Sequence, residues 1–139
     1  MFQRTDEIRV QGGGQGLVDF TGQVAGLVAA SGISQGLCTV FVRHTSASLI
    51  IQENADPSVC RDLERYLNKL VPENDPDYTH TMEGPDDMPA HIKGALTATS
   101  IGIPVMEGRL SLGTWQGVYL WEHRRRPSQR KVVVSIIGV

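Results

Sequence analysis

The last third of the chain reads IGIPVMEGRLSLGTWQGVYLWEHRRRPSQRKVVVSII from residue 101 to residue 137. Four runs in it have the composition of β-strands: Ile101–Met106, Arg109–Leu112, Gln116–Glu122 and Lys131–Ile137. Residues typical of turns separate these runs. Strands that follow one another at such short intervals predict an antiparallel sheet or sandwich with helices packed outside it.

The residues before this region add both strands and helices. Three further runs predict strands: Ile8–Val10, Leu37–Arg43 and Leu49–Ile51. Apolar spacing and terminal residues predict helices over Asp19–Ser31, Asp56–Leu70 and Met88–Thr99. Thr21 is expected to cap the first helix and Gly32 to end it. We therefore expect an α+β fold: a single compact domain over residues 1–139, with an antiparallel β-sandwich-like sheet arrangement and peripheral helices.

Composition limits the classes of function. The net charge of −2 argues against a nucleic-acid partner, because phosphate backbones are usually met by an excess of Lys and Arg. No apolar run is long enough to span a bilayer, and residues 1–7 lack the pattern of a secretory signal. We expect a cytoplasmic protein without a membrane partner, in which Cys38 and Cys60 are reduced packing residues.

The histidines are the first candidates for chemistry. His80, Glu83 and His91 form a His-x-x-Glu-x7-His pattern that crosses a polar loop and reaches the start of a helix. Imidazole binds zinc, whereas Glu83, Asp86 and Asp87 would suit an oxygen-rich magnesium site. The alternative role of Asp86 and Asp87 is to cap the helix and solvate the loop. The pattern does not decide between zinc and magnesium.

Other polar residues allow a binding role or a structural one. The hydroxyls of the turn His44–Ser48 could bind a phosphate or stabilise the turn. Gly113–Gln116 could present Trp115 to a planar ligand or form a hairpin turn packed by a core Trp. The basic residues from Arg124 to Lys131 could attract a small phosphorylated ligand, but most such runs are solvated.

Four segments together resemble the YjbQ-like family, which is also labelled secondary thiamine-phosphate synthase. They are GLCTVFVRHTSA (36–47), QENADP (52–57), EGPDDMPAHIK (83–93) and GRLSLGTWQ (108–116). The resemblance extends from about Gly16 to Gly138. It implies a compact α+β fold with β-sandwich-like sheets, commonly assembled as a homotrimer.

The resemblance also implies an activity: a weak transferase that joins a pyrimidine diphosphate to a thiazole phosphate and releases pyrophosphate. Its partner would be a small phosphorylated metabolite, and its cofactor a divalent metal ion, zinc or magnesium. On this basis we assign catalytic roles to His44, Glu83, Glu122 and Arg124, and metal binding to His80, His91 and His123. Substrate binding is assigned to Ser46, Asn54, Gly113, Thr114, Trp115 and Gln116, with Glu53 as a further pocket residue. A metal-dependent hydrolase and a non-enzymatic metabolite-binding trimer stay open as alternatives.

Overall fold

The larger of two sheets is built from the first, the last and three middle strands of the chain. The computed structural model describes residues 1–139. Strands β1 (Phe2–Gly12), β8 (Ser128–Gly138), β3 (Gly36–Val42), β5 (Ser100–Met106) and β6 (Arg109–Leu110) lie in the order β1-β8-β3-β5-β6, and all pair antiparallel. In β8 the side chains of Val132, Val134 and Ile136 alternate into the core, as a strand with one buried face requires.

The smaller sheet lies between the larger sheet and a helix. It contains β2 (Gly16–Asp19), β7 (Gln116–Glu122) and β4 (Ala47–Glu53) in the order β2-β7-β4. Val118 and Leu120 of β7 join the main core, whereas Trp121 packs in a second apolar cluster with Leu67 and Val71 from α2 and the residue after it. Because both faces of β7 are covered, this strand is buried from Gly117 to Glu122.

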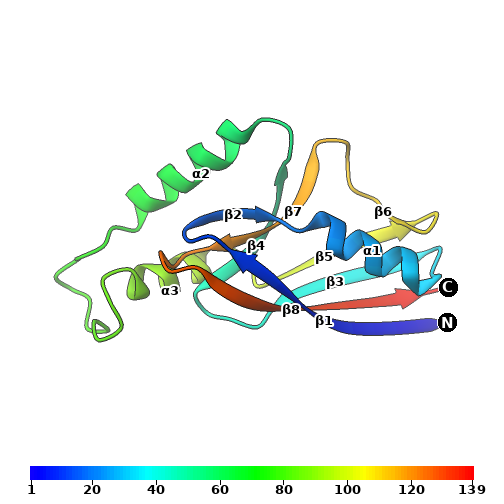
Figure 1. Ribbon diagram of the computed structural model, residues 1–139, viewed down its shortest axis with the longest axis horizontal. Coiled ribbons are helices and arrows are strands. Elements are labelled where there is room, and N and C mark those ends of the chain that lie inside the picture. Colours follow the sequence, from blue (N-terminus) through cyan, green and yellow to red (C-terminus); the bar gives the residue numbers. More distant parts are fainter.

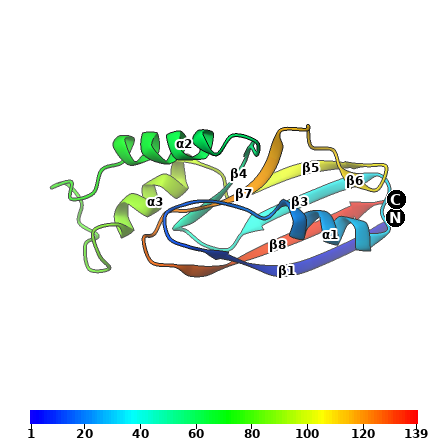
Figure 2. The ribbon, with the colours of Figure 1, turned by 45° about the horizontal axis from the view of Figure 1, so that its top comes forward.

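Three helices complete the fold: α1 (Thr21–Ser31), α2 (Pro57–Leu70) and α3 (Asp87–Leu96). Helix α1 packs Val24 and Val28 into the main core and ends at Gly32, whose φ of 72° is left-handed. Helix α2 begins after Asp56, whose side chain accepts a 2.9 Å hydrogen bond from the Ser58 amide. Helices α2 and α3 lie at one end of the molecule and the two termini at the other (Figures 1 and 2). None of the helices is long and apolar enough to cross a membrane.

A close backbone contact joins two loops at the helical end. Gly14, between β1 and β2, has a φ of 117°, and a Cβ at this position would lie 2.7 Å from the Arg125 carbonyl oxygen. Glycine is therefore required both by the backbone conformation and by the space. Next to it, Gln15 Nε2 donates to the His123 carbonyl oxygen over 3.1 Å. The contacts of Gly14 and Gln15 thus hold the loop after β7 in place.

The predicted α+β class with antiparallel sheets and helices is confirmed. Thr21 as the cap of α1 is wrong: Phe20 occupies the N-cap position, and Asp19 Oδ1 instead accepts from the amide and hydroxyl of Thr21. Strand β2 was not predicted, because four residues give little periodicity. The strands β1, β4 and β8 are longer than predicted, and α3 ends at Leu96, before Thr99. Beyond the end of α3, Ala98 forms an isolated β-bridge with Leu49 of β4 rather than continuing the helix.

Candidate metal site and arginine-rich cavity

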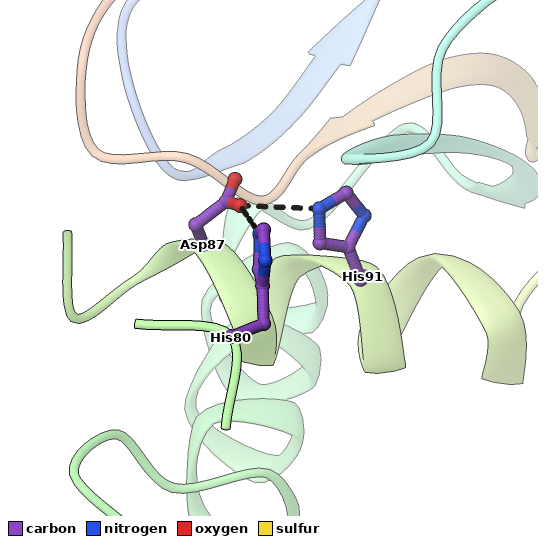
Figure 3. A group of neighbouring side chains, drawn as sticks. All are labelled: His80, Asp87 and His91. Atoms are coloured by element: carbon purple, nitrogen blue, oxygen red, sulfur yellow. Dashed lines mark hydrogen bonds and ion pairs between the residues drawn. The ribbon is translucent and has the colours of Figure 1, made fainter. Parts of the chain in front are cut away.

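Two imidazoles and one carboxylate meet at the start of α3. His80 Nε2 lies 2.6 Å from Asp87 Oδ2, and His91 Nε2 lies 3.1 Å from the same oxygen. The three candidate ligand atoms are all within 4.8 Å of one another. Figure 3 shows the two rings converging on the carboxylate, His91 from within α3 and His80 from the preceding loop. The structure thus contains a His/Asp group that could hold a metal ion.

The local sequence explains this convergence. Asp87 is the first residue of α3, and His91 follows four residues later, so both lie on the same face of the helix. Asp86, at the N-cap position, makes no side-chain cap, so the capping role considered for it is wrong. Its carboxylate accepts instead from the Arg124 guanidinium and the Arg125 amide, both at 3.0 Å. These bonds attach the start of α3 to the loop after β7.

Asp87 is held as a buried carboxylate. Burial alone would raise its pKa, but the hydrogen bond to His80 and the Arg124 charge together hold the pKa of Asp87 below its usual value. Its two oxygens are divided between partners: Oδ2 faces the imidazoles, and Oδ1 accepts from Arg124 Nη1 over 2.5 Å. Arg124 also donates to the Glu83 carbonyl oxygen over 2.9 Å. Arg124 therefore positions the carboxylate and the loop, which leaves it few free donors.

The chemistry of this donor set fits a metal ion. Neighbouring ligand atoms of a tetrahedral zinc with bonds of about 2.0–2.1 Å are roughly 3.3 Å apart. The His91–Asp87 separation of 3.1 Å is close to this, whereas the His80–Asp87 separation of 2.6 Å is that of a hydrogen bond and would lengthen around an ion. The second oxygen of Asp87 is already hydrogen-bonded to Arg124, as is usual for a ligating carboxylate. Two imidazoles with one carboxylate favour zinc or another transition metal over magnesium, which prefers oxygen ligands.

A second polar group is buried where β4, β7 and β8 meet. Glu122, fully buried, accepts from Arg130 Nε over 2.7 Å and from Arg130 Nη2 over 2.5 Å. Arg130 Nη2 also donates to the carbonyl and hydroxyl oxygens of Ser46, over 3.2 and 3.1 Å. This bidentate ion pair satisfies both charges inside the protein. Glu122 and Ser46, assigned to catalysis and substrate binding, thus both contact Arg130.

His44 lies on the edge of this group. Its Nε2 accepts a 2.8 Å hydrogen bond from the Lys131 amide, so this nitrogen carries no proton. Partial burial, together with the Arg130 charge, lowers the pKa of His44. The imidazole is therefore held in its neutral form beside the Arg130 guanidinium, whose Nη1 lies 3.3 Å from its Nδ1.

His123 does not belong to the His80 group. It is buried and lies 2.8 Å from the Ser48 hydroxyl through Nε2, whereas its Nδ1 is buried without a hydrogen-bond partner. Burial lowers the pKa of His123 to about 3, and the nearby charges of Lys93 and Arg130 act in the same direction. His123 is consequently a neutral core residue next to Trp121.

A polar cavity of about 500 Å³ opens beside these groups. None of its lining residues is hydrophobic, and four of them are arginines. The lining consists of Ser46, Glu83, Gly84, Asp86, Arg124, Arg125, Arg126, Ser128 and Arg130. We call this space the arginine cavity. Its excess of positive charge suits an anionic ligand.

The remaining predicted residues lie at the far end of β7. Gln116 pairs with Glu53, whereas Glu122 pairs with Ala47, so the two ends are roughly 20 Å apart at about 3.3 Å per residue. There Gln116 Oε1 accepts from the Gly113 amide over 2.8 Å, and Trp115 is 63% exposed. Within one chain, Asn54 and the Gly113–Gln116 segment, including Thr114, do not meet the histidines.

Two residues of these groups were missed as site residues by sequence reasoning. Asp87 was considered only for a magnesium site or a capping role, although its spacing of four from His91 on a predicted helix was visible. Arg130 was treated as part of a basic run. Its place in an alternating series with Val132, Val134 and Ile136 could have indicated that it faces inward.

Fold and site together describe an α+β protein of two antiparallel sheets, with a His/Asp group next to a cationic cavity. The chain belongs to the family described as UPF0047 protein YjbQ-like, whose model matches residues 6–139. The resemblance stated from its motifs is confirmed.

Relatives and solved structures agree with this assignment. The chain is 60% identical to UPF0047 protein sll1880 of Synechocystis over 125 residues, 90% of this chain and 85% of the relative. It is 42% identical to the YjbQ protein of Salmonella typhimurium, covering 99% of this chain and 98% of that protein. A YjbQ/UPF0047 crystal structure from Clostridium acetobutylicum, 41% identical, superposes with a TM-score of 0.84 over 96% of this chain and 99% of that one.

Proposed function

We propose that this chain is a metal-dependent transferase that acts on small phosphorylated heterocycles, joining a pyrimidine diphosphate to a thiazole phosphate. One observation carries the proposal: Asp87 belongs to the His/Asp group and is also bonded to Arg124, which lines the arginine cavity. Its Oδ2 faces His80 and His91, and its Oδ1 is bound to Arg124. A divalent ion, zinc or a similar transition metal, would therefore be held next to cationic residues.

This arrangement suits the departure of a diphosphate. In the proposed reaction the bond between carbon and the diphosphate oxygen breaks, and its electron pair leaves with the oxygen. The lone pair of the thiazole ring nitrogen forms the new bond to that carbon. A bound metal ion would supply charge neutralisation for the leaving group. Arg125 and Arg126 of the cavity wall are exposed and can approach the phosphoryl oxygens. Arg124 and Arg130, whose donors are largely occupied, act as positioning residues.

Hydrolysis is the second candidate, and the donor set favours it. Catalytic zinc sites commonly use three protein ligands and keep one position for water. His80, Asp87 and His91 would leave such a position, because they supply three ligand atoms. A hydrolase would use water where the transferase uses the thiazole. The third candidate, a metabolite-binding protein, would fill the same cavity without turnover.

A homotrimer is proposed as the assembled form. On the outer face of the five-stranded sheet, the exposed Leu37 lies opposite the exposed Ile137, and the exposed Phe41 lies opposite the half-buried Val133. Leu37, Phe41 and Ile137 are between 42% and 46% exposed, and the small polar pair Thr39–Ser135 lies between the two apolar pairs. Light scattering after size exclusion would give three times 15.2 kDa, and a monomer at micromolar concentration would refute the trimer.

Metal analysis tests the proposed function first. The purified protein is expected to bind one zinc-class ion per chain, and His80→Ala, His91→Ala and Asp87→Asn should each reduce that content. The buried His123 provides a matched control, since His123→Gln should leave it unchanged. Wild-type content in all three site variants would refute the metal site.

Product analysis then separates the three candidates. A transferase should release pyrophosphate only when both substrates are present, and only in the metal-loaded protein. A hydrolase should convert one phosphorylated substrate with water alone. Saturable binding without any product would refute an enzymatic role.

A further inference from the structure

A second, smaller polar cavity borders Arg125. Its volume is about 250 Å³, and its six lining residues come from four separate segments. They are Gln15, Asn68, Val71, Glu73, Lys93 and Arg125. We call it the Lys93 cavity. Arg125 lines both this space and the arginine cavity, so one guanidinium borders two polar cavities.

Lys93 is an unusual wall for such a cavity. It lies in the last turn of α3 and is only 2% exposed. An ammonium group has three N–H donors, but the single hydrogen bond of Lys93 Nζ is to Asn68 Oδ1. It forms no salt bridge, because the nearby carboxylates are committed elsewhere: Glu73 to Arg125, and Glu64 to Trp121 and Asn68. Two donors and a buried positive charge are thus left over.

A buried ammonium group without a salt bridge is costly: burial lowers the pKa of Lys93, and an anionic ligand placed against it would favour its charged form. The walls carry two positive side chains, Lys93 and Arg125, against one negative side chain, Glu73. The donors of Lys93 come from α3 and those of Arg125 from the loop after β7, so they reach the space from two directions. A tetrahedral oxyanion, with acceptors on several sides, matches donors arranged in this way.

We propose that the Lys93 cavity binds the phosphate group of a small phosphate monoester, with Lys93 as its buried cation and Arg125 at the border. Two anionic groups, from one ligand or from two, could then bind at the same time, one in each of the two cavities that Arg125 borders. In the proposed transferase, on which this assignment rests, the diphosphate would occupy the arginine cavity and the monophosphate the Lys93 cavity. Phosphate binding by Lys93 does not itself depend on the metal site.

Site-resolved phosphate titration tests the proposal. Inorganic phosphate is added to chelator-treated protein, and amide resonances of Asn68 and Lys93 are followed separately from those of Arg126 and Ser128. Saturable chemical-shift changes are expected for the amides of Asn68 and Lys93. In Lys93→Met the apparent affinity there should fall by at least about tenfold, the effect of losing a charged hydrogen-bond donor. Lys69→Met, an exposed lysine on α2, is the matched control and should behave as the wild type.

A second variant protects the test against misfolding. Asn68→Asp keeps an acceptor for Lys93 but adds a negative charge to the wall, so phosphate affinity should again fall by about tenfold or more. Wild-type phosphate affinity at the amides of positions 68 and 93 in both variants, or no saturable shifts there in the wild type, would overturn the proposal. His80→Ala should bind phosphate normally in the Lys93 cavity, so loss of the metal function leaves this result unaffected.

Discussion

The two ends of β7 differ in how they accommodate polar groups. At the Glu122 end, charged side chains are buried and paired: Glu122 with Arg130, and Asp87 with Arg124 and two imidazoles. At the Gln116 end, Trp115 and its polar neighbours face solvent. The segments that carry the family resemblance supply residues to both ends: Asp87 and His91 near the Glu122 end, and Trp115 at the Gln116 end. A strong motif therefore does not by itself place its residues in one site.

The difference follows from what covers each end. Helices α2 and α3 and the loop after β7 enclose the Glu122 end, so a charge there is stabilised by a partner inside the protein or, as proposed for Lys93, by a bound ligand (Figure 2). The Gln116 end continues into the exposed turn that starts at Gly113, where water satisfies polar groups. We expect substitutions at the enclosed end to change the free energy of unfolding, and those at the open end to leave it almost unchanged.

The largest effect is expected for Arg130→Met. This change leaves Glu122 buried without its ion-pair partner, which typically costs about 3–5 kcal/mol of unfolding free energy. Arg126→Met, which replaces an exposed arginine of the same cavity that makes no side-chain hydrogen bond, is the matched control and should change stability by less than about 0.5 kcal/mol. Urea unfolding followed by circular dichroism measures both. Equal losses in the two variants would contradict the buried ion pair.

A smaller effect concerns pH. The folded protein holds the pKa of His123 at about 3, against 6.5 in the unfolded chain, because the imidazole is buried. The unfolded chain therefore binds a proton first as the pH falls, and the stability present above pH 6.5 is progressively lost towards pH 3. The slope is at most about 1.4 kcal/mol per pH unit for one histidine. His44, whose pKa is also lowered, adds a contribution of the same sign.

The His123→Gln variant isolates this contribution. Unfolding free energies measured between about pH 6.5 and 5.5, where most carboxylates stay ionised, should fall less steeply in the variant than in the wild type. An unchanged slope in His123→Gln would mean that His123 is not held neutral by burial.

Much of the fold was predictable because it depends on local patterns. Alternation in Lys131–Ile137 and the apolar spacing of Val24 and Val28 report directly which face is buried. Strand β2 and the cap of α1 were not predicted, since they depend on contacts made by distant residues. Asp19 belongs to β2, which pairs with β7, and its carboxylate replaces a cap from Thr21.

The candidate site was only partly predictable. The meeting of His80 with His91 depends on the path of a loop of irregular sequence, which spacing alone does not determine. The sequence motif suggested Glu83 as their companion, but the carboxylate that meets them is Asp87, one turn before His91. Whether Trp115 and Asn54 act with them is a question of assembly, because within one chain the length of β7 separates the two groups.

The smallest effect is expected at the open end. Trp115→Ala removes a side chain that is 63% exposed, so the unfolding free energy of the subunit should change by less than about 0.5 kcal/mol. Trp121→Ala is the matched comparison: this indole is buried and its Nε1 donates to Glu64, and its loss should cost about 3–5 kcal/mol. Thermal unfolding at several protein concentrations measures both. A loss above about 2 kcal/mol for Trp115→Ala that grows with protein concentration would mean that another copy of the chain covers Trp115, because binding stabilises the folded state by mass action. The open end of β7 would then be part of an interface, and the contrast between its two ends would hold only for the isolated subunit.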